Sequence, residues 1–297
     1  MNQRADIFNQ HRARLYGIGY RMLGSRADAE DMLQEAYLRW HKVDMERVQV
    51  PAAWLTTTMT RLCIDRLRSA RTEREAYAGP WLPEPLVDGV AAPADRQAEL
   101  ASDLSMAFMV VLEQLAPEER AAFLLHDVFE CDYAEIARIL GKNETNCRQI
   151  VSRARERVRR DKPRFTVSET AHRRLLTRFL DAMRTGDQKA MVELFSEDAT
   201  WTADGGGKVP ATSRTLTGGA RVAKLMAGFS RRAMQPYLDQ FEFRLASING
   251  ETGIVAYREG RLFWALALET DGTHILAGYN VINPEKLARI ELPDLHD

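Results

Sequence analysis

The stretch Tyr133–Ala154, YAEIARILGKNETNCRQIVSRA, decides the fold in the middle of this 297-residue chain. Its first eight residues have the apolar spacing of a short amphipathic helix. Gly141 can then adopt the left-handed conformation that ends a helix, and Asn143 is a typical N-cap for the next one. Two short helices joined by a glycine turn predict a helix-turn-helix motif.

The second helix of this motif has two chemically different faces. Cys147, Ala154, Val158 and either Ile150 or Val151 have the spacing of a buried stripe. The opposite face exposes Glu144 and the candidate DNA contacts Thr145, Asn146, Arg148, Gln149, Ser152, Arg153 and Arg155. Polar side chains can read base edges and arginines can bind phosphates, so this face is predicted to enter a major groove. The alternative is a helical hairpin with a solvated charged face.

Charge is segregated along the chain although the formal net charge is only −1. From Arg138 to Arg164, ten basic residues and three acidic ones leave +7. From Glu84 to Glu119, eight acidic residues and one basic one leave −7. Blocks of opposite charge indicate parts with different partners.

The composition, with 45% hydrophobic and 28% charged residues, is that of a globular chain of two or three domains. Cys63, Cys131 and Cys147 have no metal-ligand spacing, and one of them must stay unpaired in any disulfide scheme. A reduced, cytoplasmic compartment is therefore expected. The chain shows neither a signal-peptide core nor an apolar run near ~18 residues, so secretion and membrane spanning are not expected.

Residues 1–76 are predicted to be all-helical. One helix opens with Asp28, Glu30 and Asp31, where the helix dipole favours acids, and a later one starts at Pro51. That later helix carries an apolar stripe beside a basic flank, formed by Arg61, Arg66, Arg68 and Arg71. A solvated face explains this flank as well as a nucleic-acid contact does.

The strongest linker signal is AGPWLPEPLVDGVAAPA, residues 78–94, with four prolines and two glycines. Trp81, Leu82 and Leu86 are costly to leave in water, so the linker is expected to dock on another part of the protein. Helices resume from about Glu99.

The C-terminal part has a different texture. Thr166 and Glu169 predict a capping box that opens a helix ending near Met183, and a second helix covers 188–195. Strand-like runs then alternate with the hairpin signals Asn249-Gly250, Glu259-Gly260 and Asp271-Gly272. This pattern predicts an α+β domain with an antiparallel meander.

The loop Asp204-Gly205-Gly206-Gly207-Lys208 interrupts that domain. Three consecutive glycines cost folding entropy, so they indicate backbone freedom or a close approach. One interpretation is contact with another domain, with Asp204 and Lys208 as charged clasps. The others are a backbone amide nest for an anion and a plain mobile loop.

Residues 1 to about 160 resemble an extracytoplasmic-function (group IV) sigma factor of the sigma-70 family. Three stretches carry the resemblance in the right order: DAEDMLQEAYLRW (28–40), WLTTTMTRLCIDRLRSARTERE (54–75) and LEQLAPEERAAFLLHDVFECDYAEIARILGKNETNCRQIVSRARERV (112–158). The resemblance implies that the second stretch, with Arg61, Arg66, Arg68 and Arg71, melts and reads the −10 element. It implies that the third reads the −35 element. The first would dock on the clamp helices of core RNA polymerase, with Asp31, Met32, Leu33, Gln34 and Glu35 at or beside that contact.

Residues from about 170 to 297 resemble the SnoaL-like, ketosteroid-isomerase-like cone that one group of these sigma factors carries. The marks of that group are WLPEP (81–85), DGGGK (204–208) and NPDKL, which reads NPEKL at 283–287 in this chain. The resemblance implies a built-in regulator in place of a separate anti-sigma protein. The predicted interdomain contacts are Trp81, Leu82, Asp204, Gly205, Gly206, Gly207, Lys208, Asn283, Pro284, Glu285, Lys286 and Leu287.

The expected organisation is sigma domain two over 1–76, a linker over 77–98, sigma domain four over 99–162 and the cone over 168–297. The expected function is that of a sigma factor that binds core polymerase and promoter DNA, regulated in cis by the cone. The alternative is a one-component helix-turn-helix regulator with a ligand-sensing cone, which leaves DAEDMLQEAY unexplained.

Enzymatic activity is not expected, because the available acid–base candidates form no convincing dyad. These candidates are Asp204, Glu269, Asp271 and His274. No metal or other cofactor is predicted, and a small-molecule ligand for the cone stays open.

Overall fold

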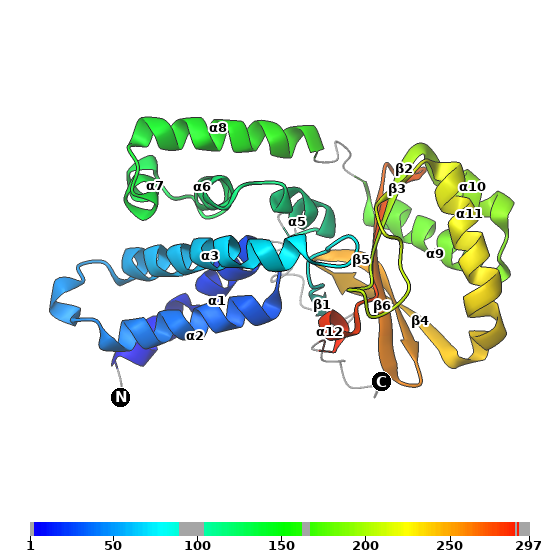
Figure 1. Cartoon of the computed structure of the whole chain (residues 1–297), viewed down its shortest axis with the longest axis horizontal. Helices are drawn as coiled ribbons and strands as arrows, with labels where there is room; N and C mark the ends of the chain where they lie inside the picture. The colour runs from blue at the N-terminus through cyan, green and yellow to red at the C-terminus, as the bar shows by residue number, and fades with distance from the viewer. Residues whose placement is uncertain (1–2, 89–103, 162–166, 289, 291–297) are drawn as a thin grey trace. The chain divides into compact units, whose positions relative to one another are not determined.

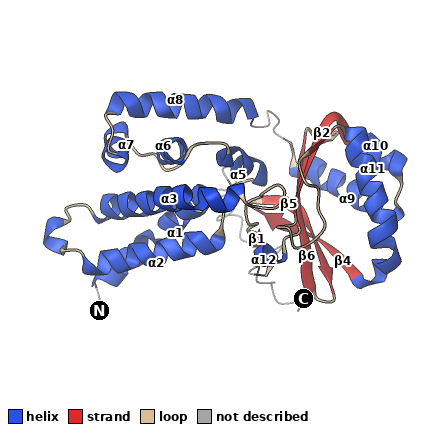
Figure 2. Cartoon of the chain, viewed as in Figure 1, coloured by secondary structure: helices blue, strands red, loops and turns tan. Residues whose placement is uncertain are grey.

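The computed structural model describes residues 3–88, 104–161, 167–288 and 290. Two compact units make up the chain. One comprises Met1–Ala76 and Phe108–Lys162, and the other Tyr77–Ala107 and Pro163–Asp297. The first unit is helical, whereas the second contains the sheet (Figure 2). The helix start expected near Glu99 lies outside the described residues.

The N-terminal part of the helical unit consists of α1 (Gln3–Leu23), α2 (Arg26–Lys42), a 3-10 turn (Met45–Arg47) and α3 (Pro51–Glu75). Ser25 caps α2, because its hydroxyl accepts the Asp28 N–H at 3.2 Å. The apolar stripes of the three helices meet in a core that includes the fully buried Trp40.

The second part of this unit consists of α5 (Met106–Glu113), α6 (Pro117–Asp127), α7 (Tyr133–Leu140) and α8 (Glu144–Asp161). The predicted helix-turn-helix is present in α7 and α8. Gly141 has φ 65° in the turn, and Asn143 Oδ1 accepts the Asn146 N–H at 2.8 Å. Val151 is fully buried while Ile150 is half-buried, so Val151 is the core residue of α8.

The cone is a single sheet with helices on one face (Figure 1). The strand order is β1-β4-β5-β6-β7-β2-β3, and β2 pairs with β7 in parallel while the other neighbours are antiparallel. The strands are β1 (Val87–Asp88), β2 (Phe195–Asp204), β3 (Leu216–Thr217), β4 (Phe241–Ile248), β5 (Glu251–Arg258), β6 (Arg261–Thr270) and β7 (Ile275–Val281). The helices are α9 (Glu169–Thr185), α10 (Gln188–Leu194), α11 (Gly219–Phe229), the turns Ser230–Met234 and Gln235–Gln240, and α12 (Pro284–Leu287).

The three predicted hairpin turns all join consecutive strands of the meander. Glycines with positive φ occupy their second positions, at 82° for Gly250, 73° for Gly260 and 92° for Gly272. The predicted capping of α9 is wrong in one respect. The N-cap is Ser168, whose hydroxyl accepts the Ala171 N–H at 3.3 Å, whereas Thr166 lies outside the described residues.

Candidate functional site

A buried ion pair in the cone unit holds the linker. Asp204 ends β2 and Lys286 lies in α12, with side chains 0% and 8% exposed and Nζ 2.7 Å from Oδ2. The same Oδ2 accepts the Leu82 N–H at 2.8 Å, and Lys286 Nζ donates to the Leu82 carbonyl oxygen. One ion pair therefore satisfies both backbone polar groups of one linker residue. We call Asp204, Lys286 and Leu82 the linker clamp.

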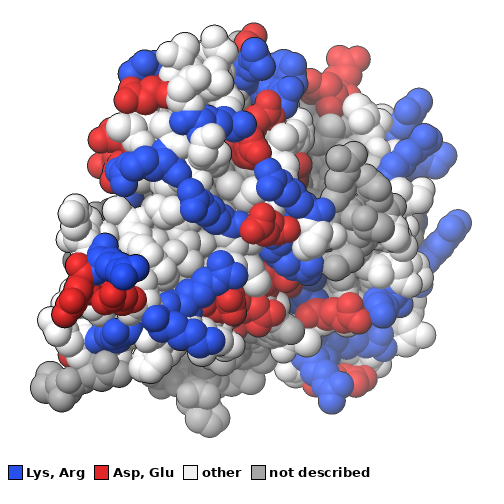
Figure 3. Space-filling view, turned by 60° about the vertical axis from the view of Figure 1, so that its left-hand side comes forward, with Lys and Arg blue, Asp and Glu red and all other residues white. Residues whose placement is uncertain are grey.

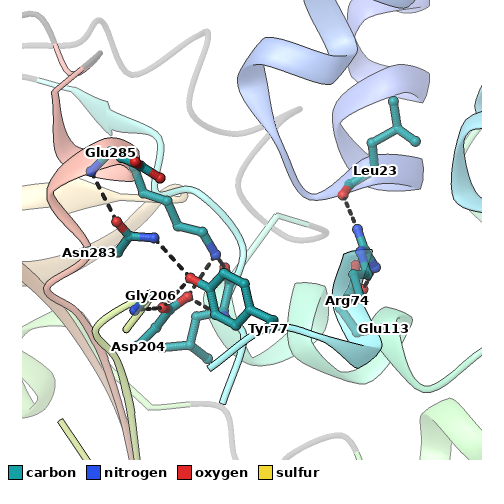
Figure 4. Close-up of polar contacts among 10 residues, drawn as sticks. Leu23, Arg74, Tyr77, Glu113, Asp204, Gly206, Asn283 and Glu285 are labelled. Carbon is teal, nitrogen blue, oxygen red and sulfur yellow. Dashed lines mark hydrogen bonds and ion pairs between the residues drawn. The ribbon is translucent and has the colours of Figure 1, made fainter. Parts of the chain in front are cut away.

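Two aromatic residues of the linker complete this environment, and Figure 4 shows the first of them, Tyr77. The Tyr77 hydroxyl donates to Asp204 Oδ1 at 2.6 Å and accepts from Asn283 Nδ2 at 2.9 Å. Burial and the hydrogen bond to Asp204 raise the pKa of Tyr77, so its phenol stays protonated. The Lys286 ammonium lies over the ring of Trp81, with Nζ 4.1 Å from the ring centroid, and makes a cation–π contact with it.

Local structure positions the two charges. Ile282 N–H donates to the Asp204 carbonyl at 2.9 Å, which places the end of β2 beside the segment that follows β7. Asn283 is the N-cap of α12, because its Oδ1 accepts the Glu285 N–H at 3.0 Å, and Pro284 follows as the first helical residue. The short helix then carries Lys286 toward Asp204.

Two glycines of the DGGGK loop lie close to Asn283 and Ala78, where a side chain would not fit. Gly206 and Gly207 have φ 60° and 69°, and a Cβ on them would lie 2.3 Å from Asn283 and 2.8 Å from Ala78. The Gly206 N–H donates to Asp204 Oδ1 at 3.0 Å, so the loop's own carboxylate already uses that amide. The geometry supports a close approach at this loop, and the segment approached is the linker, which belongs to the same unit. Contact of the loop with another domain stays a prediction.

A second attachment lies further along the linker. Leu86 N–H donates to Asn249 Oδ1 at 3.0 Å, and Asn249 N–H donates to the Leu86 carbonyl at 2.8 Å. The chain then enters the sheet as β1, with Val87 opposite Ile248. The expected docking of the linker is observed on the cone, with Leu82 fully buried and Trp81 half-buried.

Lys208 forms an ion pair inside the cone, and its role as a clasp to another domain stays a prediction. Lys208 and Glu285 pair at 3.1 Å with side chains that are 55% and 70% exposed, so water screens both. Sequence reasoning pointed to Leu86 but missed Tyr77 and Asn249. Tyr77 directly precedes the proline-rich stretch, which was an available signal, whereas Asn249 was hidden because Asn-Gly is a turn signal in its own right.

On α2, the structure separates the predicted polymerase contacts. Asp31 and Gln34 are exposed, Met32 and Glu35 are half-buried, and Leu33 is buried in the core. Leu33 therefore packs in the core of the helical unit, and its place at or beside the polymerase contact stays a prediction. Leu38 is 52% exposed and lies seven residues after Asp31, on the same helix face. Sequence reasoning missed it because leucines of an amphipathic helix are expected to point inward.

The predicted −10 arginines of α3 make contacts inside the helical unit. Arg61 donates to the carbonyl oxygens of Arg138 and Ile139 at 2.8 and 2.9 Å, which lie at the end of α7. The other two described arginines form ion pairs, Arg66 with Asp28 at 2.9 Å and Arg68 with Glu118 at 2.6 Å. Figure 3 shows how often basic and acidic side chains lie side by side on one face of the molecule. The side chain of Arg71 lies outside the described part of the structure.

Arginine-to-carbonyl contacts recur across this unit. Arg120, only 2% exposed, donates to the Met22 carbonyl at 2.7 Å, and Arg74 donates to the Leu23 carbonyl at 2.7 Å (Figure 4). Both arginines also pair with Glu113. Carbonyls at helix C-termini lack intrahelical partners and carry partial negative charge, so cations are favourable there. These arginines join the α1–α3 part to the helix-turn-helix part.

On α8, six of the seven predicted −35 contacts are exposed. They are Thr145, Asn146, Arg148, Gln149, Ser152 and Arg153. Arg155 is the exception, because it is half-buried with Nε 2.7 Å from Asp127 Oδ2. Its hydrogen bonds with Asp127 raise the pKa of Arg155 and hold α8 on α6. Its assignment as a DNA contact stays a prediction, and the pairing with Asp127 gives it a structural role as well.

The cone encloses a cavity of about 1010 Å³. Its lining is mainly apolar and includes Phe179, Trp201 and Trp264. None of the four acid–base candidates lines it among the described residues. Glu269 is half-buried elsewhere on the sheet, and burial raises the pKa of its carboxyl to about 7.

Three further findings concern the cysteines, the helices and possible metal ligands. Cys63, Cys131 and Cys147 are buried free thiols. Within the described residues, no helix is long and apolar enough to cross a membrane. No group of three or more potential metal ligands is found in that same part of the chain.

Comparisons with known proteins agree with this architecture. The family model of sigma-70 region 2 matches residues 7–73, and that of sigma-70, region 4 matches residues 105–158. The chain is 41% identical to the ECF RNA polymerase sigma factor SigJ of Mycobacterium tuberculosis over 255 residues. The aligned part covers 85% of this chain and 80% of SigJ. The chain is 33% identical over 186 residues to the probable ECF sigma factor SigI of the same species, covering 62% of this chain and 64% of SigI.

The crystal structure of M. tuberculosis SigJ matches with a TM-score of 0.77 at 34% identity, over 97% of this chain and 99% of that one. A one-component regulator is not favoured, because the region 2 match includes the DAEDMLQEAY stretch that it leaves unexplained. The all-α sigma regions are followed by an α+β cone, as predicted. The chain therefore belongs to the extracytoplasmic-function sigma factors of the sigma-70 family.

Proposed function

We propose that this sigma factor recruits core RNA polymerase to promoters in the cytoplasm and that its cone regulates it in cis through the linker clamp. The observation that carries the regulatory part is the buried Asp204–Lys286 pair bonded to both backbone groups of Leu82. The linker joins sigma regions 2 and 4. A linker held on the cone cannot bind another surface at the same time, so the clamp limits the positions open to the two regions.

The proposed polymerase-docking surface is the exposed face of α2. It contains Asp31, Gln34, Glu35 and, in place of Leu33, the exposed Leu38. Acidic groups around one exposed apolar side chain fit a polar interface with a small apolar centre.

The proposed promoter surfaces are α3 for the −10 element and the exposed face of α8 for the −35 element. These elements lie about 25 base pairs apart, or on the order of 80 Å at ~3.4 Å per base pair. Arg61 of α3 is hydrogen-bonded to the last carbonyls of α7 within the helix-turn-helix. While α3 and α7 are in contact, the two promoter elements cannot be bound at the same time. We therefore propose that α3 separates from the helix-turn-helix when the protein binds polymerase.

Run-off transcription with core polymerase tests the regulatory role. The full-length variant Lys286→Met removes a charge of the clamp, and Tyr77→Phe removes the hydroxyl that donates to Asp204. Each of these two clamp variants should change transcript yield severalfold. Lys208→Met, which removes the exposed lysine of the same region, should stay within about twofold of wild type. Wild-type yield from both clamp variants would show that the clamp does not regulate the factor.

Polymerase binding is measured separately, by copurification of core enzyme. Asp31→Lys combined with Glu35→Lys should abolish binding, because like charges placed opposite each other in an interface cost on the order of several kcal/mol. Helical content must stay normal by circular dichroism. Binding that persists in this folded variant would place the docking surface elsewhere.

A further inference from the structure

The cavity of the cone has the size and lining of a small-molecule site. Its volume of about 1010 Å³ lies at the upper end of the range of ~300–1,000 Å³ for ligand pockets. Phe179, Trp201, Met226, Trp264 and Leu266 form much of its wall, and all five belong to the buried core of the cone. An apolar wall of this kind favours an apolar ligand.

Charge is confined to one part of the lining. The charged residues among it are Arg258, Glu259 and Arg261, which all lie at the β5–β6 hairpin. Arg258 already donates to Gln240 Oε1 at 2.9 Å and lies over the rings of Tyr237 and Phe241. The rest of the lining is neutral, and an ionised ligand group there would be costly to desolvate.

Two polar atoms of the lining are buried without a hydrogen-bond partner, Thr212 Oγ1 and Asn280 Oδ1, and the second can only accept. Asn280 lies on β7, and its Oδ1 is buried without a partner. Buried polar groups are nearly always hydrogen-bonded, so an orphan oxygen in a cavity indicates a position for a ligand's donor. A hydroxyl or a secondary amine would satisfy it.

The cavity also has an apolar rim. Leu225 and Phe229 on α11 and Phe263 on β6 line it and are 37%, 39% and 37% exposed. Large apolar side chains left in water beside a cavity give an apolar molecule a continuous surface to follow inward.

The cavity wall and the linker clamp share their chain segments. Ala203 precedes the clamp residue Asp204, and Val209 directly follows the DGGGK loop. Pro284 and Leu287 belong to α12, the helix that carries Lys286. A molecule that presses on these wall residues therefore acts on the segments that hold both charges of the clamp.

We propose that the cavity binds a neutral, largely apolar small molecule with one hydrogen-bond donor directed at Asn280, and that its binding changes how tightly the clamp holds the linker. The binding itself stands on the cavity, while its regulatory effect rests on the proposed function. The same occupant explains the apolar wall, the orphan oxygen and the exposed rim.

The first test uses N-phenyl-1-naphthylamine, a neutral fluorescent amine that has an apolar body and one N–H donor. Full-length protein should bind it saturably at one site per chain. Leu225→Glu at the rim should weaken binding by about tenfold or more, because a carboxylate would have to be desolvated there. Asn280→Leu, which removes the acceptor, should weaken it severalfold.

The matched control is Val192→Glu, because Val192 on α10 is a similarly exposed aliphatic residue (42%) that does not line the cavity. Its affinity should stay within about twofold of wild type. Non-saturable binding, or equal weakening by Val192→Glu and Leu225→Glu, would overturn the cavity as a ligand site. Loss of probe binding as the protein dimerises would also overturn it, because it would show that self-association buries the rim.

The second test is hydrogen exchange of the Leu82 and Leu86 amides with and without saturating probe. Their exchange rates should change severalfold with probe in wild type and stay constant in Leu225→Glu. Unchanged exchange in saturated wild-type protein would overturn the coupling to the clamp. Neither test includes polymerase, so a failure here leaves the transcription result for Lys286→Met intact, and a failure of that result leaves probe binding intact.

Discussion

The two units join distant segments by different means. In the cone unit, one carboxylate–ammonium pair out of contact with water holds a linker residue by both backbone groups. In the helical unit, several arginines each bind carbonyl oxygens at a helix end, among them Arg61, Arg74 and Arg120. The first attachment is concentrated and the second is distributed. A single substitution should therefore break the clamp, whereas the helical interface should weaken in small steps.

The largest effect is expected from Lys286→Met, which leaves Asp204 buried without its cation. Removal of one partner of a buried pair typically costs about 3–5 kcal/mol. Chemical denaturation of the full-length protein should show this loss in the cone unit, together with faster exchange of the Leu82 amide. Lys208→Met is the control and should cost less than ~1 kcal/mol. Equal losses in the two variants would mean that the clamp charge is not special.

Glu269 is a partly buried carboxyl of the same sheet whose pKa is raised, and it can be compared with Asp204, which is paired with Lys286. Burial, aided by the charge of Glu251, raises the pKa of Glu269 to about 7 from its ordinary 4.5. The raised pKa means that the folded state holds this proton more tightly than the unfolded state. The stability that Glu269 contributes is therefore present below pH 4.5 and is lost as pH rises to about 7.

Denaturation of wild type and Glu269→Gln across this pH range measures that contribution. Their difference in unfolding free energy should change by roughly 2–3 kcal/mol between pH 4.5 and 7.5, with wild type losing more as pH rises. A constant difference would show that Glu269 is as well hydrated folded as unfolded.

Substitution of an exposed arginine of α8 should change DNA affinity, whereas substitution of one that pairs with another helix should change stability. Arg148→Ala or Gln149→Ala should weaken binding to a matched −35 element by ~1–3 kcal/mol and relax specificity at one base pair, without loss of stability. Arg155→Ala should instead destabilise the packing of α8 on α6, because it removes the partner of Asp127. The measurements are DNA affinity for a set of single-base variants and the unfolding midpoint. The assigned register of α8 would be wrong if both Arg148→Ala and Gln149→Ala bound normally.

The smallest effect is expected from Arg61→Ala. It removes two hydrogen bonds to carbonyls that water can reach, so the cost should be about 0.5–1.5 kcal/mol. Hydrogen exchange at the end of α7 reports it directly. A loss as large as that of Lys286→Met would show that the helical interface is concentrated too.

Local signals predicted much of the fold. Gly141 and Asn143 fixed the turn of the helix-turn-helix, and Gly250 and Gly260 marked hairpins, because these positions need a conformation or a cap that few residue types supply. Such requirements are legible in a few adjacent residues.

The sites were less predictable, because burial of a charge depends on distant chain segments. Lys208 and Lys286 each belong to a short motif, but only Lys286 is buried. Its burial depends on the Asn283 cap of α12 and on the end of β2, which bring it to Asp204. Arg155 shares the polar pattern of its exposed neighbours, and its ion pair is made with Asp127 on another helix. Periodicity along one helix does not contain that information.

The two-residue strand β1 has a consequence for the protein when the linker is released. Val87 and Asp88 pair with Ile248 and Ser247 and so cover one end of the outer edge of β4. An uncovered strand edge presents N–H and C=O groups that can pair with the strand of another chain. The docked linker thus also protects the sheet from unwanted association, and any state in which the linker leaves the cone must trade that protection for freedom of the sigma regions.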